Sequence, residues 1–339
     1  MHVQDIDHVE FYVGDADEAA AALRAQYGFR LHGWVRDQPD HYSVLLRQGS
    51  IQLLLTSART GGHPAADYVA AHGDGLATVA LSTDDPAAAL AEALARGATA
   101  DGTRVTGFGD VGHVFVRPGE LLSTVELATE SADDPLDLLD AVDHIAACVA
   151  PGELDPTVAY YEQVLGFKQI FEEHIEVGGQ AMNSKVVQSV SKEVTLTLLE
   201  PDTTARPGQI DDFLAAHHGP GVQHLAFRTA DIATAVRTLR GRGVGFLSTP
   251  GSYYDALAER FEHVAVPVEQ LRELDILVDQ DNEGELFQIF TQTTHPRRTL
   301  FFEVIERLGA LTFGSANIKA LYEAVERDRA GEHVRGAAQ

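Results

Sequence analysis

The sequence has few cysteines and few basic residues, and each scarcity excludes a class of protein. Cys148 is its only cysteine, so the chain cannot form an internal disulfide, and we expect a reducing, cytoplasmic environment. Acidic residues outnumber basic ones by 51 to 25, which gives a formal net charge of -26. Such a charge opposes binding to nucleic acid and to anionic membranes, so neither is an expected partner.

Long hydrophobic runs are also missing. No apolar stretch is long enough to span a bilayer. Residues 1–13 lack the basic start and the continuous apolar stretch of a signal peptide. However, 45% of the 339 residues are apolar, which is enough for the cores of two ordinary domains. The composition therefore indicates a globular protein and leaves a small-molecule substrate open.

An internal repeat is the first positive feature of the chain. Residues 219–229, GPGVQHLAFRT, match residues 73–83, GDGLATVALST, in register. Residues 142–167 parallel residues 6–29, with two extra residues. A repeat of this size indicates duplication of a whole module. We therefore expect a first domain over residues 1–130, an acidic linker over residues 131–141 and a second domain over residues 142–339.

Each half shows the same succession of strands and helices. A short strand with an Asp-His pair precedes an amphipathic helix that ends in Tyr-Gly-Phe or Leu-Gly-Phe, and short apolar strands follow. A second strand–helix unit comes next. The order is βαβββ, twice per half, which predicts an α+β fold of tandem modules. Residues 317–332 are expected to form a C-terminal helix with apolar Ile318, Leu321, Tyr322 and Val325.

Three residues of the second half are candidates for chemistry. His144 lies on its first predicted strand, His224 on the strand VQHLAFRT and Glu303 on the strand TLFFEVIER. Because side chains alternate along a strand, Glu303 shares a face with Phe301 and Ile305, and we expect that face to point inward. Two histidines and one carboxylate on separate strands form a ligand set for non-haem iron(II), which leaves positions open for substrate and dioxygen.

The residues alone leave a second interpretation open, in which these three side chains are unrelated and structural. An isolated histidine at the start of a strand is more often structural than a ligand. The repeat favours the metal interpretation, because His8 lies opposite His144 whereas Thr78 occupies the place of His224. One half therefore has the pattern of a scaffold without a site, and the other has the pattern of the working copy.

Other features carry weaker signals. Gln288 lies between Leu286 and Phe290 on one strand face, where a buried amide needs hydrogen-bond partners. Residues 293–298, TTHPRR, are interpreted as a solvated loop, and Cys148 as a core residue. None of these features adds a catalytic residue to the three candidate ligands.

Seven segments together resemble one known family. They are VDHIA, YYEQVLGF, GQIDDFL, GVQHLAF, FQIFT, FFEVIER and TFGSANIKALYEAVE. The chain is similar to the family that contains 4-hydroxyphenylpyruvate dioxygenase and 4-hydroxymandelate synthase, which has the vicinal oxygen chelate fold. The resemblance covers nearly the whole chain, because that family also has a degenerate N-terminal repeat. It implies open, barrel-like mixed sheets with outer helices.

The resemblance also implies roles for individual residues. Iron(II) would be the cofactor, held by His144, His224 and Glu303. The segment from Phe313 to Ile318 would lead into a C-terminal helix that gates the pocket. The residues that the resemblance places around the substrate are Ser184, Thr197, Leu199, Gln209, Gln223, Gln288, Phe290, Phe301, Phe313, Asn317 and Ile318.

Three of these positions favour the synthase within the family. The dioxygenase typically has Pro, Asn and Phe where this chain has Thr197, Leu199 and Ile318. The resemblance therefore implies conversion of 4-hydroxyphenylpyruvate and O2 to 4-hydroxymandelate and CO2, by oxidative decarboxylation and benzylic hydroxylation. Such a reaction would supply hydroxyphenylglycine precursors to a peptide antibiotic.

Two alternative functions stay open at this point. One is 4-hydroxyphenylpyruvate dioxygenase, which makes homogentisate. The other is a non-catalytic protein that binds a small molecule, against which an inward-facing Glu303 argues. A homodimer that uses the metal-free half as its interface is a further expectation.

Overall fold

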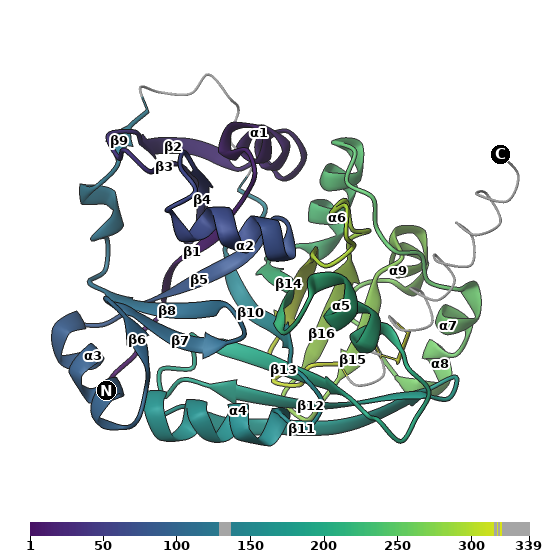
Figure 1. Cartoon of the computed structure of the whole chain (residues 1–339). Coiled ribbons are helices and arrows are strands. Elements are labelled where there is room, and N and C mark those ends of the chain that lie inside the picture. The colour runs from purple at the N-terminus through teal and green to yellow at the C-terminus, as the bar shows by residue number, and fades with distance from the viewer. Residues whose placement is uncertain (129–136, 315–316, 318, 321–339) are drawn as a thin grey trace, which may run out of the picture.

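Two mixed sheets form the protein, one from each half of the chain (Figure 1). The structure is a computed structural model that describes residues 1–128, 137–314, 317, 319 and 320. The elements of the first half are β1 (Ile6–Tyr12), α1 (Ala16–Tyr27), β2 (Arg30–Val35), β3 (His41–Gln48), β4 (Ile51–Ala58), α2 (Pro64–His72), β5 (Gly75–Ser82), α3 (Pro86–Ala95), β6 (Ala100–Asp101), β7 (Arg104–Phe108), β8 (Val111–Val116), the 3-10 helix η1 (Leu121–Ser123) and β9 (Glu126–Leu127).

The second half repeats this succession and adds short helices before its last three strands. Its elements are β10 (Ala141–Cys148), α4 (Leu154–Tyr160), the π-helix η2 (Tyr161–Leu165), β11 (Lys168–Val177), β12 (Gln180–Gln188), β13 (Thr195–Pro201), α5 (Gln209–His217), β14 (Gly221–Arg228), α6 (Ile232–Gly241), α7 (Gly251–Asp255), α8 (Leu257–Arg260), α9 (Val268–Leu274), β15 (Leu277–Gln280), β16 (Glu285–Phe290) and β17 (Phe301–Leu308). The predicted α+β fold of tandem βαβββ modules is confirmed.

The two sheets have the same strand order. Read from one edge, the first runs β2-β3-β4-β1-β5-β8-β7-β6, with β9 added beyond β2. The second runs β11-β12-β13-β10-β14-β17-β16-β15. The central pairs also share their register, since His8 pairs with Ala80 as His144 pairs with Ala226. The duplication seen in the sequence is therefore a duplication of the whole sheet.

The turn after the first helix of each half requires glycine. Gly28 ends α1 at φ 76°, and Gly166 ends the π-helix η2 at φ 73°. Both values lie in the left-handed region that other residues adopt at a steric cost. At the other end of α1, the Asp15 carboxylate accepts the backbone N–H groups of Asp17 and Glu18. These local signals explain why the Gly-Phe turns recur at equivalent places.

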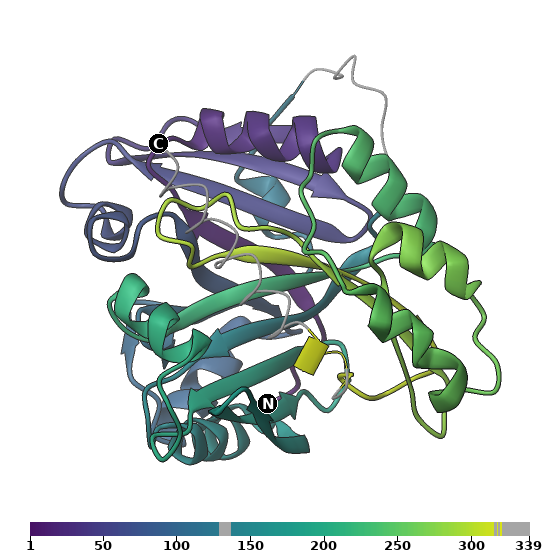
Figure 2. The ribbon, with the colours of Figure 1, turned by 90° about the vertical axis from the view of Figure 1, so that its right-hand side faces the viewer.

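Apolar side chains from both sheets pack into one continuous core, and Figure 2 shows the strands of the two halves side by side. Phe29 packs edge-on against Phe227, with ring centroids 5.8 Å apart, and Tyr27 against Phe302 at 5.1 Å. Cys148 is fully buried, as predicted. Among the described residues, no helix is long and apolar enough to cross a membrane.

Three expectations need correction or lie outside the described part. The predicted linker extends one residue too far, because Ala141 already pairs with Arg228 in the second sheet. Residues 293–298 are not simply solvated, since Arg297 donates to the backbone carbonyls of Ala70 and Ala71 at the end of α2. Of the expected C-terminal helix, only residues 317, 319 and 320 are described, and all are helical; the rest lies outside the described residues.

Candidate metal centre and substrate pocket

Three buried side chains converge on one face of the second sheet. β10, β14 and β17 are neighbours in that sheet, and both His144 and Glu303 pair with Ala226 of the central strand. Nε2 of His144 lies 3.3 Å from Oε2 of Glu303, and Nε2 of His224 lies 3.4 Å from the same oxygen. Two ligand atoms roughly 2.1 Å from a shared ion are about 3.0–3.4 Å apart. The three predicted ligands are therefore spaced to hold a single metal ion.

The charges of these residues leave a position that a cation can take. Burial acts to raise the pKa of Glu303, but His144 and His224 outweigh it and lower that pKa to about 2. Burial acts to lower the pKa of His144, but Glu303 and Asp143 raise it to about 9. Burial also lowers the pKa of His224. In the metal-free protein a proton on His144 thus balances Glu303, and a divalent cation can replace that proton.

Each histidine is oriented by the side chain of the preceding residue. Nδ1 of His144 lies 2.9 Å from Oδ1 of Asp143, and Nδ1 of His224 lies 3.2 Å from Oε1 of Gln223. Because both partners are acceptors, each ring carries a proton on Nδ1 and presents Nε2 to Glu303. Gln223, predicted as a substrate residue, therefore also orients a ligand.

A chain of amides links Glu303 to the C-terminal segment. Nε2 of Gln288 donates to Oε1 of Glu303 at 2.8 Å, and Nδ2 of Asn317 donates to Oε1 of Gln288 at 2.9 Å. The Tyr253 hydroxyl donates to Oδ1 of Asn317 at 2.9 Å. Gln288 is 2% exposed, so it is the buried amide that the strand pattern indicated, and its partners are these two side chains.

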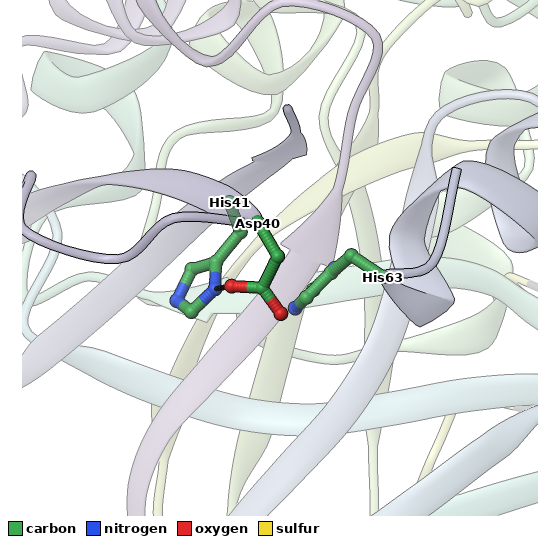
Figure 3. Close-up of side chains that lie close together, drawn as sticks. All are labelled: Asp40, His41 and His63. Atoms are coloured by element: carbon green, nitrogen blue, oxygen red, sulfur yellow. Dashed lines mark hydrogen bonds and ion pairs between the residues drawn. The ribbon is translucent and has the colours of Figure 1, made fainter. Parts of the chain in front are cut away.

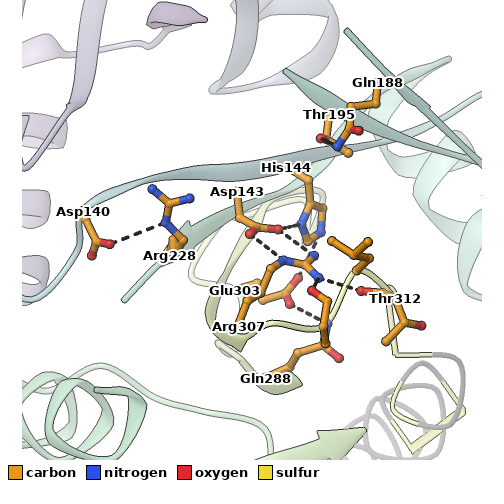
Figure 4. Close-up of polar contacts among 12 residues, drawn as sticks. Asp140, Asp143, His144, Gln188, Thr195, Arg228, Gln288, Glu303, Arg307 and Thr312 are labelled. Atoms are coloured by element: carbon orange, nitrogen blue, oxygen red, sulfur yellow. Dashed lines mark hydrogen bonds and ion pairs between the residues drawn. The ribbon is translucent and has the colours of Figure 1, made fainter. Parts of the chain in front are cut away.

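Arg307 links His144 to the same segment (Figure 4). Its guanidinium donates to both carboxylate oxygens of Asp143, at 2.8 and 2.9 Å, and to the carbonyls of Ala310 and Thr312. Burial acts to raise the pKa of Asp143, but His144 and Arg307 hold it well below its usual range. Sequence reasoning missed the role of this ion pair. The one signal for it was the Asp-His pair that begins both halves.

A pocket lies beside the three ligands, and most of its lining was predicted. Its walls combine aromatic rings, aliphatic side chains and amides. The predicted residues that line it are Thr197, Leu199, Gln209, Gln223, Gln288, Phe290, Phe301 and Phe313. Met182 and Ile210 also line the pocket and were missed, although Ile210 directly follows Gln209 in the sequence.

Three predicted substrate residues lie elsewhere or are not described. Ser184 is buried opposite Leu199 on the neighbouring strand and is not part of the pocket wall. Asn317 is fully buried and contacts Gln288 behind the wall. Ile318 lies outside the described residues.

The first half has the same frame without the ligand set. By strand register, Val114 occupies the place of Glu303, and Thr78 that of His224. Only His8 keeps a ligand-type side chain at its place. A valine and a threonine cannot replace a carboxylate and an imidazole as ligands, so the equivalent centre is lost in this half.

Comparisons with known proteins agree with this arrangement. The model of the Glyoxalase/Bleomycin resistance protein/Dioxygenase superfamily matches residues 141–289, and a second model with the same description matches residues 7–115. The 4-hydroxyphenylpyruvate dioxygenase of Dictyostelium discoideum is 31% identical over 96% of this chain and 98% of its own length. The chain belongs to the 4-hydroxyphenylpyruvate dioxygenase family.

Other members of this family resemble the chain to a similar or greater extent. The 4-hydroxyphenylpyruvate dioxygenase of Danio rerio is 32% identical over 95% of the chain and 90% of its own length. A mutant 4-hydroxymandelate synthase from Streptomyces coelicolor has 42% identity, with a TM-score of 0.90 over 97% of this chain and all of that one. The protein is therefore a dioxygenase of this family, and His144, His224 and Glu303 form a group that could hold its metal ion. That membership argues against the non-catalytic binding protein.

Proposed function

We propose that the protein is an iron(II)-dependent 4-hydroxymandelate synthase. The observation that carries the proposal is the convergence of His144, His224 and Glu303 beside a largely apolar pocket. The 42% identity to a synthase, against 31–32% to two of the dioxygenases, supports the choice within the family.

The donor set fits ferrous iron. Two imidazoles and one carboxylate on one face of an ion leave open positions for a bidentate substrate and for O2. The iron would supply activation of O2 and a positive site for the carboxylate and keto oxygens of a 2-oxo acid. Because Glu303 contributes a single negative charge, a dipositive ion leaves the centre positive, which attracts an anionic substrate even in an acidic protein.

The pocket suits an aromatic 2-oxo acid. The rings of Phe290 and Phe313 and the side chain of Leu199 provide apolar contacts for a phenyl group. The amides of Gln209 and Gln288, which also line the pocket, provide polar contacts. 4-Hydroxyphenylpyruvate and O2 would give 4-hydroxymandelate and CO2. The C1 carboxylate would leave as CO2, one oxygen atom of O2 would become a carboxylate oxygen on the former keto carbon, and the other would hydroxylate the benzylic carbon.

Two pocket residues support benzylic rather than ring hydroxylation. Leu199 presents bulk where the dioxygenase pattern has an amide, so it removes a hydrogen-bond partner of the substrate ring. The Thr197 hydroxyl is buried and lacks a hydrogen-bond partner among the described residues, so it is free to bind substrate. Because a displacement on the order of 1 Å matters to reactivity, these side chains can decide which carbon is hydroxylated.

The product distinguishes the two enzymes. The protein, loaded with iron(II) and given 4-hydroxyphenylpyruvate in air, is expected to yield 4-hydroxymandelate as the main peak on chromatography. The His224→Ala variant should lose nearly all oxygen uptake, roughly 1,000-fold or more, because two ligands hold the ion poorly. Homogentisate as the main product would instead identify a 4-hydroxyphenylpyruvate dioxygenase. Full oxygen uptake by His224→Ala would contradict the metal assignment.

Three further expectations stay predictions. They are the cytoplasmic location, the homodimer through the first half and a role in supplying an antibiotic precursor. Size-exclusion chromatography with light scattering would test the dimer directly.

A further inference from the structure

A second group of metal-ligand side chains lies in the first half of the chain. Asp40 and His41 stand at the start of β3, and His63 stands at the N-cap of α2. One ligand atom from each residue lies within 4.8 Å of the others. Figure 3 shows the Asp40 carboxylate between the two imidazole rings. The group shares no residue with the centre at His144, His224 and Glu303.

The backbone holds these residues together before any ligand is present. The N–H groups of Arg59 and Thr60 donate to the carbonyl of Asp40, at 2.7 and 3.3 Å, and the N–H of His63 donates to the carbonyl of Thr60 at 3.3 Å. The rings of His41 and His63 are 4.6 Å apart and tilted by 33°. The loop between β4 and α2 is thus folded back onto β3, so little chain entropy remains to be lost on binding.

The three side chains are half-buried, and Asp40 and His63 have protonation states suited to a cation. The hydrogen bond from His41 lowers the pKa of Asp40, so that carboxyl is ionised at neutral pH. Burial, with the neighbouring His41, lowers the pKa of His63, so that ring is neutral. Glu10 acts on His63 in the opposite sense, which places a second carboxylate near the group.

We propose that Asp40, His41 and His63 bind a divalent transition metal ion such as Zn2+. Two imidazoles and a carboxylate suit zinc, cobalt, nickel or copper better than calcium or magnesium, which prefer oxygen ligands only. Three protein ligands leave a fourth position for water. The positive end of the α2 helix dipole, at its N-terminus, repels a cation, and the negative charges of Asp40 and Glu10 offset that repulsion.

Binding exchanges two existing contacts for metal bonds. Nδ1 of His41 lies 2.9 Å from Oδ1 of Asp40, and Nδ1 of His63 accepts the N–H of Ala65 at 3.2 Å. An imidazole that binds a metal through one nitrogen carries its proton on the other. The cap bond to Ala65 is long, so little is lost when the proton of His63 moves to Nδ1.

The ion would fix the start of a helix whose other end contacts the catalytic half. At the C-terminal end of α2, Nδ1 of His72 donates to the carbonyl of His217 at 2.6 Å, and the two rings stack at 4.3 Å. Stabilising α2 therefore stabilises the contact between the two halves. Metal added to the protein should raise its unfolding temperature through this site, by ordinary linkage.

Zinc stoichiometry tests the proposal. The full chain, stripped of metal with a chelator and titrated with ZnCl2 in a calorimeter, is expected to bind two ions per molecule, checked by elemental analysis after gel filtration. His63→Ser keeps a capping hydroxyl for α2 and removes the imidazole, so it should bind one ion fewer. Asp40→Asn should show the same loss, and His32→Ala, a half-buried histidine of β2 outside the group, should still bind two.

The patterns of loss separate this site from the catalytic centre. His224→Ala should remove the other binding event and retain the one that depends on His63. Two results would overturn the proposal. In one, the unsubstituted protein binds a single ion and His224→Ala binds none. In the other, His63→Ser binds as many ions as the unsubstituted protein. Circular dichroism identifies any variant that fails to fold. If His63→Ser does not fold, the number of ions bound by Asp40→Asn tests the proposal in its place.

Discussion

At the scale of single residues, the centre depends on a proton that a metal ion must displace. Glu303 and His144 lie in a site from which water is largely excluded, and each shifts the pKa of the other towards its charged form. His144 therefore holds a proton up to a pH of about 9 in the metal-free protein. Below that pH a metal ion must displace the proton from His144, and above that pH His144 is already deprotonated and the metal ion has no proton to displace.

This competition predicts proton release on metal binding. At pH 7, binding of a divalent ion at the catalytic centre should release about one proton from His144, and the affinity should rise roughly tenfold per pH unit up to about pH 9. Calorimetry in buffers of different ionisation enthalpy measures the number of protons. An affinity that is flat between pH 6 and pH 8 would contradict the protonated His144.

At the scale of elements, the ligands are positioned by contacts between strands. Arg307 of β17 holds Asp143 of β10, and Asp143 orients His144. The same guanidinium holds the carbonyls of Ala310 and Thr312, so the ligand and the segment after β17 share one anchor. The planar guanidinium donates two parallel hydrogen bonds and so fixes the orientation of the carboxylate, which a lysine ammonium group cannot do.

Replacement of the Arg307 guanidinium by an ammonium group should weaken metal binding although the positive charge is retained. Arg307→Lys is expected to lower affinity for the catalytic metal by roughly 10–100-fold, because Asp143 loses its bidentate partner and His144 its fixed orientation. Competition with a chelator of known affinity gives the value. Arg237→Lys, at an exposed ion pair with Glu273 on the outer helices, is the control and should leave affinity unchanged. Equal metal affinities of Arg307→Lys and Arg237→Lys would show that the bidentate contact of Arg307 with Asp143 is dispensable.

At the scale of the whole molecule, a buried polar contact joins the two halves. Nε2 of His113 in β8 lies 2.7 Å from the hydroxyl of Tyr161 in η2, and both residues are buried. Burial lowers the pKa of His113 to about 4, so this ring is neutral and the pair is a plain hydrogen bond. A buried polar group that loses its partner costs more than the net contribution of the bond itself.

Removal of one hydroxyl should therefore destabilise both halves together. Tyr161→Phe is expected to lower the free energy of unfolding by about 1–3 kcal/mol, because His113 keeps no partner at Nε2. Guanidinium unfolding, followed by fluorescence and circular dichroism, measures it. Tyr160→Phe, the neighbouring and more exposed tyrosine that donates to the carbonyl of Thr106, should cost less because water replaces its partner. A larger loss in Tyr160→Phe would argue against the buried bond.

Much of the fold and of the centre could be predicted from the sequence, and the failures have a common cause. The repeat predicted the βαβββ order, and strand alternation predicted that Glu303 faces inward. The polar composition of residues 293–298 predicts a solvated loop, yet carbonyls of α2 accept hydrogen bonds from Arg297. Asp143 and Arg307 are 164 residues apart, and Met182 contributes to the pocket from β12. Contacts between distant segments leave no periodicity in the chain.

The sequence by itself determined the duplication, the types of the three ligands and the half that carries them, because side-chain chemistry and strand alternation are local properties. Only the tertiary structure decided that β10, β14 and β17 are adjacent, so that three residues spread over 160 positions meet around one point. It alone also brought Asp40 and His41 to His63, because the loop before α2 folds back through hydrogen bonds that no sequence pattern encodes. Distance in space depends on the packing of the whole chain, and packing depends on all residues at once.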